Sequence, residues 1–509
     1  MSAGNKIAKN VIANYVGVFG QIAIAFFLSP FLVNTLGDTK YGIWTIVAAL
    51  SGYMSLLDLG ISSAIGRYVS KYHQSSDHQK LNAIVNSALL LFLLISTLVV
   101  LISPWTSRFI VNFVNFDAEL ESTVQLLVVI VSFDVAIFVI SGIFRGAFVG
   151  FQRYEVINFA IITSSIYKAI LFYVFLSNEY GLLTMGLISI SANLLTASAY
   201  FLVLKRSYKF LTITPVKANR KATLDIWSFG KFTFIGMLAN QVIYYSDAFV
   251  IGYFLSAAAV TYYTIPWSLM EYTMRLCLGI SRTFVPAFSA QEELNDTSQI
   301  YKLYISGTKY MLIVSNLLCV GIMVFGGDFI AIWMGERFRE ICAPLVLILF
   351  TTLLIQAPQL ISYSLLLGLA KHKTYSYVSI GVSVCNLVLS IVLVQQYGLI
   401  GVAIGSAVPQ ILFHGVFVPY YTNKALGFSI WAYYLKTYLS VLLPTLILFV
   451  ALFTLKSFYA PTGFLILLAE AALAAIIFII SAYFLTLSRE EKNSALALIS
   501  TIKTKVLKK

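Results

Sequence analysis

Apolar runs long enough to cross a lipid bilayer follow one another along almost the whole sequence. A hydrocarbon core about 30 Å thick needs a helix of about 20 residues. The runs are continuous and about twice as long as the 9–11 residues of a tilted barrel strand, so they predict helices. With 59% hydrophobic and only 11% charged residues, the chain also lies outside the composition of water-soluble domains. The sequence therefore predicts an all-α integral membrane protein with about fourteen spans, near residues 11–35, 41–64, 81–103, 122–148, 155–176, 181–204, 226–254, 258–287, 305–326, 342–369, 374–396, 398–422, 433–455 and 461–487.

Lysine and arginine are distributed unequally between the two sets of predicted loops. If the N-terminus lies in the cytoplasm, the cytoplasmic loops and tail carry roughly twenty-two basic residues. The opposite loops carry only Lys40, Arg108, Arg337, Arg339 and Lys456. Basic residues concentrate on cytoplasmic loops, so both termini are expected in the cytoplasm and the number of spans is expected to be even. Topology thus accounts for most of the net charge of +13, and no nucleic-acid partner is expected.

Short sequence matches recur at a shift of 217–219 residues. The segment Leu59–Ser62 matches Leu278–Ser281, and Gly150 is followed by a basic residue at Arg153 as Gly368 is at Lys371. A shift of six spans keeps the orientation of each helix, so the matches predict a parallel repeat about an axis along the membrane normal. The predicted parts are an N-terminal six-helix lobe (1–204), a basic cytoplasmic linker (205–224), a C-terminal six-helix lobe (225–424), two additional transmembrane helices (425–487) and a basic cytoplasmic tail (488–509).

Charged residues inside the predicted spans are the candidate functional residues, because each costs about 2.5–3.5 kcal/mol at a helix centre. Two lobes leave a central cleft, and the planar guanidinium of arginine suits a phosphate that enters it. We expect a cationic, substrate-binding cleft formed by Arg145, Arg275, Arg282, Lys168 and Lys231. Four acids are candidates for ion coupling or for helix pairing: Asp58, Asp134, Asp247 and Glu271.

Local structural roles stay open for several of these charges. Glu271 and Arg275 have the spacing of an ordinary ion pair along a helix. Asp58 precedes Leu59-Gly60 and can cap a helix break, whereas Lys168 has Asp134 as its expected partner. Arg145, Arg282 and Lys231 can extend toward an interface, as expected also of Lys309 and Lys436 at the ends of their spans. Glu470 lies outside the repeat, where a structural role is expected.

The sequence contains no motif for catalysis or cofactor binding. It has no Walker A segment, and its four histidines lack the spacing of metal ligands. We therefore predict no catalytic residue, no metal site and no cofactor. The four cysteines lie in or beside apolar runs and are expected to pack as small hydrophobic residues. In the tail, Leu496, Ile499, Ile502 and Val506 recur among lysines, which predicts an interfacial helix.

Several short motifs carry a family resemblance over nearly the whole chain. They include Lys9-Asn10, Leu36-Gly37, Tyr41–Trp44, Leu56–Ile61, Arg67-Tyr68, Ser246-Asp247, Ile251–Phe254 and Tyr262-Tyr263. With this order and spacing the chain resembles the polysaccharide-transporter branch, of O-antigen flippase type, of the multidrug/oligosaccharidyl-lipid/polysaccharide flippase superfamily. The resemblance implies a MATE-like fold with a cationic lumen, in the bacterial cytoplasmic (inner) membrane.

The same resemblance implies the substrate and the partners. The substrate would be an undecaprenyl-pyrophosphate-linked oligosaccharide that moves from the inner to the outer leaflet, coupled to an ion gradient. Membrane lipids, and the polymerase and chain-length proteins of a polysaccharide pathway, would be the partners. Asp58 and Asp247 match the recurring acidic positions of the family best.

Two other functions stay open at this point. A cation or drug antiporter of the MATE type would need acidic, aromatic pockets, whereas half of the charges inside the spans are basic. A membrane glycan polymerase or ligase would need a substantial outside loop, and the largest predicted ones, 104–121 and 327–341, are short. The flippase is the leading hypothesis.

Overall fold

The computed structural model describes residues 3–115, 117–176, 181–458, 461–489 and 491–493. Within these residues every regular element is a helix, so the predicted all-α class is confirmed. The long helices are α1 (Ala3–Leu36), α2 (Asp38–Met54), α3 (Ile61–Gln74), α4 (His78–Phe113), α5 (Glu121–Gly150), α6 (Tyr154–Leu176), α7 (Gly181–Ser207), α8 (Arg220–Phe254), α9 (Ala257–Arg282), α10 (Phe284–Glu293), α11 (Thr297–Met334), α12 (Arg339–Gly368), α13 (Lys373–Leu412), α14 (Val418–Leu426), α15 (Ile430–Lys436), α16 (Tyr438–Phe458) and α17 (Phe464–Leu485). Short turns of helix are η1 (Ser55–Asp58), η2 (Ala118–Leu120), η3 (Pro215–Lys217), η4 (Glu336–Phe338) and η5 (Phe413–Phe417).

Ten of the described helical stretches are long and apolar enough to cross a membrane, or eleven if α2 and α3 form one bent span. The stretch Lys373–Leu426 supplies two of the predicted spans, because the chain reverses at Gly398 (φ 57°). A Cβ at Gly405 would lie 2.5 Å from the backbone nitrogen of Ser390, a contact that only a hairpin allows. Since α8 and α9 cover two further predicted spans, the helices are consistent with the expected fourteen.

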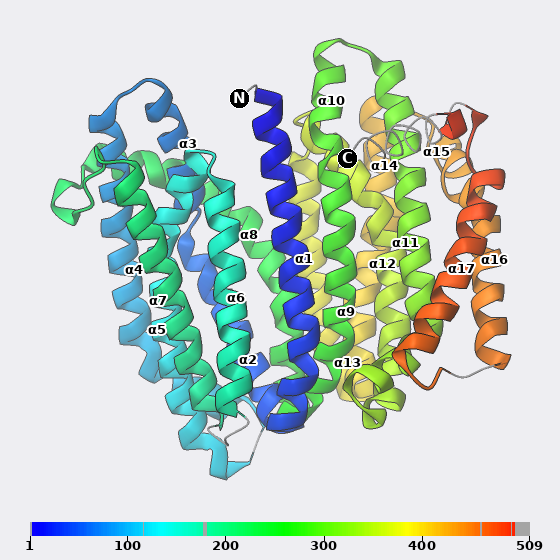
Figure 1. Cartoon of the computed structure of the whole chain (residues 1–509), viewed down its shortest axis with the longest axis horizontal. Helices are drawn as coiled ribbons and strands as arrows, with labels where there is room; N and C mark the ends of the chain where they lie inside the picture. The colour runs from blue at the N-terminus through cyan, green and yellow to red at the C-terminus, as the bar shows by residue number, and fades with distance from the viewer. Residues whose placement is uncertain (1–2, 116, 177–180, 459–460, 490, 494–509) are drawn as a thin grey trace, which may run out of the picture. The chain divides into compact units, whose positions relative to one another are not determined.

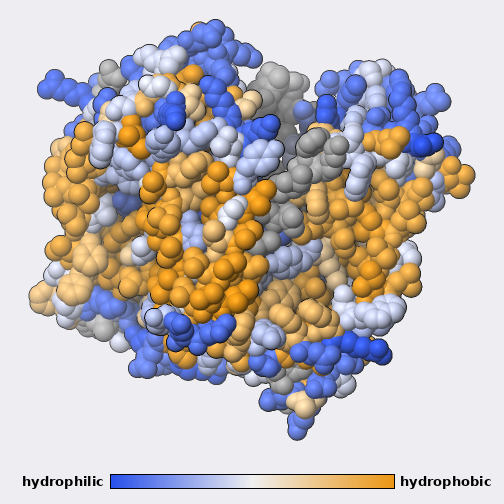
Figure 2. Space-filling model, turned by 180° about the vertical axis from the view of Figure 1, so that it is seen from behind, coloured by the Kyte–Doolittle hydropathy of each residue, from blue (hydrophilic) through white to orange (hydrophobic). Residues whose placement is uncertain are grey.

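Hydrophobic and hydrophilic side chains occupy different levels of the molecular surface. Figure 2 shows hydrophobic residues across the middle of the visible face and hydrophilic residues at its two ends. Large apolar side chains such as Leu465 (85% exposed) and Phe27 (76%) lie at the surface. Such a surface fits lipid rather than water, so the chain is a multi-pass membrane protein.

The helices group into two compact units. Unit 1 comprises residues Met1–Thr264 and Ser383–Gly405, and unit 2 comprises Ile265–Val382 and Ser406–Lys509. The chain therefore passes from one unit to the other inside α9 and twice inside α13. The predicted lobe boundaries at residues 204 and 225 stay a prediction.

In unit 1, small residues allow α3 and α5 to approach each other closely. Gly142, Gly146 and Gly150 recur every four residues on one face of α5. A Cβ at Gly146 would lie 2.8 Å from the carbonyl oxygen of Ser62, and a Cβ at Gly150 equally close to that of Gly66. Glycines at helical spacing let two membrane helices pack with their backbones in contact, and α3 therefore lies directly along α5 (Figure 1).

The predicted basic linker between α7 and α8 is fastened to α4 rather than free. Asn82 Oδ1 accepts a hydrogen bond from Thr212 N at 2.8 Å, and Asn86 Oδ1 accepts one from Thr214 N at 2.7 Å. Ser87, like Asn86, is fully buried, and its Oγ accepts from Asn219 N at 2.9 Å. Three polar side chains of one helix thus satisfy the backbone of an irregular segment, as a packed loop requires.

In unit 2, α16 packs against α11 through both apolar and polar contacts. Val320 and Phe325 of α11 share an apolar cluster with Leu448 and Leu452 of α16 and with Phe478 of α17. Two polar contacts join α11 and α16 at different depths: Asn316 donates to Thr445 at 2.7 Å, and Lys456 lies 2.8 Å from Asp328. The helices α16 and α17, which lie outside the predicted repeat, therefore pack as part of unit 2.

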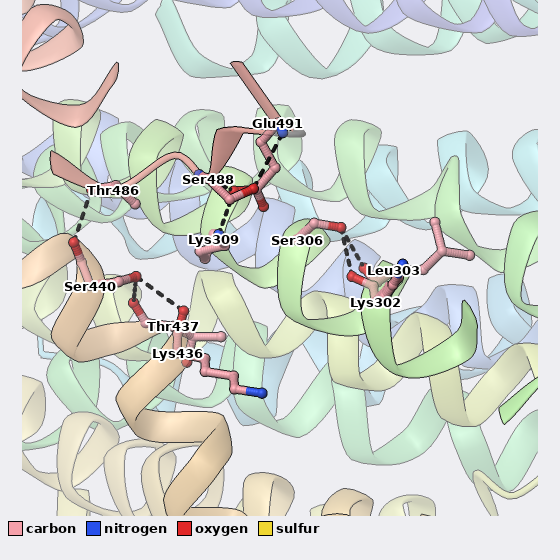
Figure 3. Close-up of polar contacts among 10 residues, drawn as sticks. All are labelled: Lys302, Leu303, Ser306, Lys309, Lys436, Thr437, Ser440, Thr486, Ser488 and Glu491. Carbon is pink, nitrogen blue, oxygen red and sulfur yellow. Dashed lines mark hydrogen bonds and ion pairs between the residues drawn. The ribbon is translucent and has the colours of Figure 1, made fainter. Parts of the chain in front are cut away.

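The segment that follows α17 is fixed to α11 by a buried ion pair (Figure 3). Glu491 Oε2 lies 2.6 Å from Lys309 Nζ, and it also accepts from Ser488 N at 2.8 Å. Glu491 N in turn donates to Ser488 Oγ, which makes Ser488 and Glu491 a capping box. Lys309 is only 8% exposed, because the tail covers it and supplies its counter-charge; that Lys309 extends toward the interface stays a prediction. The rest of the predicted interfacial helix, with Leu496, Ile499, Ile502 and Val506, lies outside the described residues.

Backbone turns recur at the shift predicted from the sequence matches. Left-handed residues end α3 at Ser76 (φ 56°) and α10 at Asn295 (φ 55°), 219 positions apart. In both cases the next residue, Asp77 or Asp296, caps the following helix. Gln152 after α5 and Ala370 after α12 form a second such pair. These turns agree with the predicted repeat.

Candidate functional site

An acidic, a basic and an amide side chain meet in the middle of unit 1. Asp134 lies halfway along α5, and its Oδ1 accepts a hydrogen bond from Asn193 Nδ2 of α7 at 2.7 Å. Lys168 of α6 is close enough to interact electrostatically with the Asp134 carboxylate. The sequence predicted Asp134 as the partner of Lys168, and the structure places the two within range of an electrostatic interaction. Each of three neighbouring helices thus contributes one half-buried polar group to this site.

Asp58 and Arg145 meet where the second span is broken. Leu59 and Gly60 have positive φ angles of 50° and 74°, so the helix stops after η1 and restarts as α3. Asp58 Oδ1 accepts from Ser62 N at 2.8 Å, which is the capping role that the sequence left open. Its other oxygen lies 3.9 Å from Arg145 of α5, whose guanidinium also covers the ring of Phe138. The Arg145 side chain stays 31% exposed.

Asp247 is the most deeply buried of the predicted acids. It is 4% exposed, and the hydroxyl of Tyr263 donates to its Oδ2 at 2.7 Å. The ring of Tyr53, which packs against Tyr245 and Phe249, lies close enough to interact electrostatically with this carboxylate. Asp247 therefore lies in an aromatic, hydroxyl-lined environment that joins α2, α8 and α9 within unit 1.

The predicted charges of unit 2 lie along α9. Arg275 donates twice to Glu271 Oε1, at 2.7 and 3.1 Å, so the expected ion pair along the helix forms. The Arg275 side chain is nevertheless 43% exposed, and Arg282 at the end of α9 is exposed as well. The side chain of Lys231, the remaining predicted cation, lies outside the described residues.

The sequence prediction missed a cluster of charges at the other end of α11. Asp328 is buried between Lys456 of α16 and Arg339 of α12, and Arg339 also contacts Glu336 of η4. The segment 327–341 was predicted as a loop, yet α11 continues to Met334. The apolar run Phe329–Met334 after Gly326-Gly327 was the available signal that the helix continues.

Two partly exposed guanidinium groups are paired with carboxylates, that of Arg145 in the spanning helix α5 and that of Arg275 in α9. Arg145 is 3.9 Å from its carboxylate, a long distance for an ion pair, and Arg275 forms an ion pair with Glu271 of its own helix. Exposed pairs of this kind contribute little stability. The planar guanidinium of arginine can bind a phosphate through two parallel hydrogen bonds.

Comparisons with known proteins place the chain among polysaccharide transporters. A family model described as "Polysaccharide biosynthesis protein" matches residues 7–292. A protein of Shigella flexneri named "Putative O-antigen transporter" is 24% identical, over 80% of this chain and 95% of that protein. The "Probable low-salt glycan biosynthesis flippase Agl15" of Haloferax volcanii is 22% identical, over 80% and 81% of the two chains. These relatives are named as transporters and flippases, not as enzymes.

Solved structures show the same fold at low sequence identity. The lipid II flippase MurJ, in an inward closed conformation, superposes with a TM-score of 0.71 at 18% identity, over 94% of this chain and 98% of that one. An inward-facing multidrug transporter of the MATE family and MOP superfamily gives 0.67 at 13% identity, over 81% and 98%. The predicted MATE-like fold is confirmed, and the chain belongs to the polysaccharide biosynthesis protein family, in the polysaccharide flippase branch of that superfamily.

Proposed function

We propose that this chain is a flippase that moves an undecaprenyl-pyrophosphate-linked oligosaccharide, an O-antigen or other surface polysaccharide unit, from the inner to the outer leaflet. The names of its relatives and its family support a glycan substrate. We place the chain in the bacterial inner membrane with both termini in the cytoplasm, as the basic loops suggest. Polymerase and chain-length proteins of the same pathway are its proposed partners.

The observation that carries this proposal is the set of partly exposed arginines in spanning helices. A charge inside a span is costly and is rarely kept without a function. Arg145, Arg275 and Arg282 offer bidentate donors for a pyrophosphate, and Asp58 and Glu271 hold two of them until the headgroup arrives. Lys231 is proposed to join them, whereas Lys168 is better explained as the partner of Asp134.

Transport is proposed to occur by alternating access of two lobes around this cationic cleft. The three places where the chain passes between the compact units lie beside helix-weakening residues: Pro266, Gly381 and Gly405. Proline removes a backbone hydrogen bond and glycine has no side chain to stiffen the helix, so both are common bending points. The shared helices α9 and α13 can therefore bend while each unit keeps its packing.

Ion coupling is proposed to involve two acids of unit 1. Asp134 and Asp247 are the best placed, because each lies within an apolar bundle with hydrogen-bond donors aimed at its carboxylate. A carboxylate in such surroundings can gain or lose a proton or a cation when the conformation changes.

The proposal is tested by analysing lipid-linked intermediates in a deletion strain that expresses variants of the chain. Arg145→Ala and Arg275→Ala should each lower surface glycan and cause lipid-linked saccharide to accumulate on the inner leaflet. Lysine at either position should restore part of the activity, because it keeps the positive charge but cannot donate the two parallel hydrogen bonds of a guanidinium group. Arg337→Ala, in the predicted outer loop, is the matched control and should transport normally. Normal glycan from both alanine variants, at equal amounts of inserted protein, would refute the cationic cleft.

A cation or drug antiporter of the MATE type is the second candidate. The buried Asp247 among tyrosines favours it, because acidic, aromatic sites suit organic cations. This function predicts drug resistance that disappears in Asp247→Asn while surface glycan stays normal. A polymerase is the least favoured alternative, and it would require loss of glycan in the Arg337→Ala control.

A further inference from the structure

Unit 2 contains an apolar groove that the transport function does not use. It has a volume of about 460 Å³ and is lined by residues of α11, α12, α15 and α16. Trp431, Tyr434 and Tyr438 line one part of it, and Leu312, Leu439 and Leu442 line another. Asn316 and Thr445, which hydrogen-bond to each other, also line it midway along α11. This space, called the α15 groove below, is as large as ordinary small-molecule sites, which measure roughly 300–1,000 Å³.

The α15 groove opens sideways, toward the surface that faces lipid. Trp431 is 76% exposed, and Leu435 and Leu439 are 58% and 55% exposed. All three lie on the α15–α16 segment at spacings of four residues, and all three line the groove. A tryptophan at the level of the headgroups with leucines below it is typical of the membrane interface. An acyl chain can therefore enter the groove from the bilayer.

Two lysines without an acidic partner lie at the end of α11 that leads into the groove. Lys436 Nζ lies 5.1 Å from the centre of the Tyr301 ring. Tyr301 precedes the groove residue Leu312 by eleven residues, which is three helical turns and the same face of α11. Lys302 is its neighbour in the sequence and is exposed. No described acidic residue forms an ion pair with Lys302 or Lys436.

The acid of the segment after α17 is already paired with another lysine. Figure 3 shows Glu491 paired with Lys309, while the ammonium group of Lys436 points away from that pair. Glu491 therefore does not neutralise Lys436. Basic residues beside a gap between membrane helices on the cytoplasmic side are suited to anionic lipid headgroups.

We propose that the α15 groove binds an anionic phospholipid of the cytoplasmic leaflet, with its phosphate at Lys302 and Lys436 and its acyl chain along Leu439 and Leu442. The dimensions fit this occupant. From Lys302 to Asn316 the helix rises about 21 Å, which covers one leaflet with its headgroup rather than the whole bilayer. The lipid is a resident component that fills the junction between α11 and α16, separate from the transported substrate.

Trp431 provides a direct probe of this site. The purified full-length chain in detergent is titrated with brominated phosphatidylglycerol, and in parallel with brominated phosphatidylcholine, while tryptophan fluorescence is recorded. Bromine quenches only nearby indoles, and the difference between the wild type and Trp431→Phe isolates Trp431 among the six tryptophans. We expect saturable quenching by phosphatidylglycerol, and about tenfold weaker binding of phosphatidylcholine.

Variants separate the headgroup contact from the apolar one. The double variant Lys302→Gln/Lys436→Gln should reduce the preference for phosphatidylglycerol about tenfold. Leu442→Phe should instead fill the groove and weaken the binding of both lipids. Lys371→Gln removes an exposed lysine elsewhere in unit 2 and should change neither the lipid preference nor the binding of either lipid. Equal quenching by the two lipids, or an unchanged preference in the double lysine variant, would show only bulk lipid around the chain and overturn the proposal. Displacement of phosphatidylglycerol by undecaprenyl phosphate at an equal or lower concentration would also overturn it, because the groove would then belong to the transported lipid.

Discussion

Lys309 can lie inside unit 2 because Glu491 brings a negative charge to it from the end of the chain. Burial raises the pKa of Glu491, but the hydrogen bonds from Lys309 and Ser488 outweigh burial and hold this pKa below its ordinary value. A carboxylate with a depressed pKa contributes its stabilisation fully above the unfolded pKa of about 4.3. That stabilisation is lost as the pH falls through the lower pKa of the folded state. The contact between the tail and α11 is therefore complete at neutral pH and weakens only in acid.

Replacing Glu491 tests this contact. Glu491→Gln leaves Lys309 buried without a counter-charge, and breaking a buried pair on one side costs up to about 3–5 kcal/mol. We expect a lower midpoint of thermal unfolding in detergent at pH 7, and recovery in Lys309→Met/Glu491→Gln, which removes both charges. Below about pH 4 the difference between the wild type and Glu491→Gln should shrink. Equal midpoints at pH 7 would show that the ion pair does not stabilise the fold.

The Asp134–Lys168 pair can serve packing or transport, and removing its charges distinguishes the two. Asp134→Asn leaves Lys168 uncompensated and should lower the amount of folded protein. Asp134→Asn/Lys168→Met removes both charges and should restore folding. If the pair takes part in ion coupling, surface glycan stays low in this double variant at wild-type protein levels. If the double variant transports normally, the pair only holds α5 and α6 together.

Local contacts of charged residues could be predicted from the sequence, and distant ones could not. The Glu271–Arg275 pair follows from helical spacing, and the capping role of Asp58 follows from the Leu59-Gly60 break. The partners Lys309 and Glu491 lie 182 residues apart. Lys456 lies 128 residues beyond Asp328. Only the packing of α16, α17 and the tail on α11 creates these pairs, and nothing in local sequence specifies that packing.

At the scale of helices, the approach of α2 to the start of α9 depends on the absence of a side chain at Gly42. A Cβ at this position would lie 1.7 Å from the carbonyl oxygen of Ala257, a backbone atom that cannot turn aside. Gly42→Ala should therefore lower the free energy of unfolding by about 1–3 kcal/mol, the usual cost of overpacking. Gly381→Ala is the matched control, because a Cβ at Gly381 would meet no atom within 4 Å and alanine favours helix. Thermal unfolding of both variants in detergent measures the difference, and equal midpoints would contradict the close approach.

Helix positions were more predictable than helix ends and joins. Continuous apolar runs located the spans. The Tyr397-Gly398 pair marked the boundary between the predicted spans 374–396 and 398–422, and the chain does turn at Gly398. The segment 205–224 was predicted as a basic linker from its lysines and arginines. Its attachment to α4 depends instead on the buried side chains of Asn86 and Ser87. Asparagine and serine are common in loops and helices alike, so their composition gave no signal of this attachment.

For the whole molecule, the distribution of basic residues makes a prediction about sidedness that the helices alone do not test. If both termini are cytoplasmic, the turn after α3 with Ser75 and the turn after α10 with Asn295 face the cytoplasm. The segment with Glu119 and the η4 turn with Arg337 then face outward. All four residues are exposed, so a cysteine at each can react.

Labelling intact cells with a membrane-impermeant maleimide decides the orientation. The four native cysteines are first replaced, which is mainly needed for Cys385, the exposed one. Cysteine at Glu119 or Arg337 should react in intact cells, and cysteine at Ser75 or Asn295 only after the cells are opened. The parallel repeat requires Ser75 and Asn295 to behave alike, because they occupy matching turns at the repeat shift. Opposite behaviour of these two positions would exclude a parallel repeat, whereas reaction of both in intact cells would keep the repeat and invert the proposed orientation of the chain in the membrane.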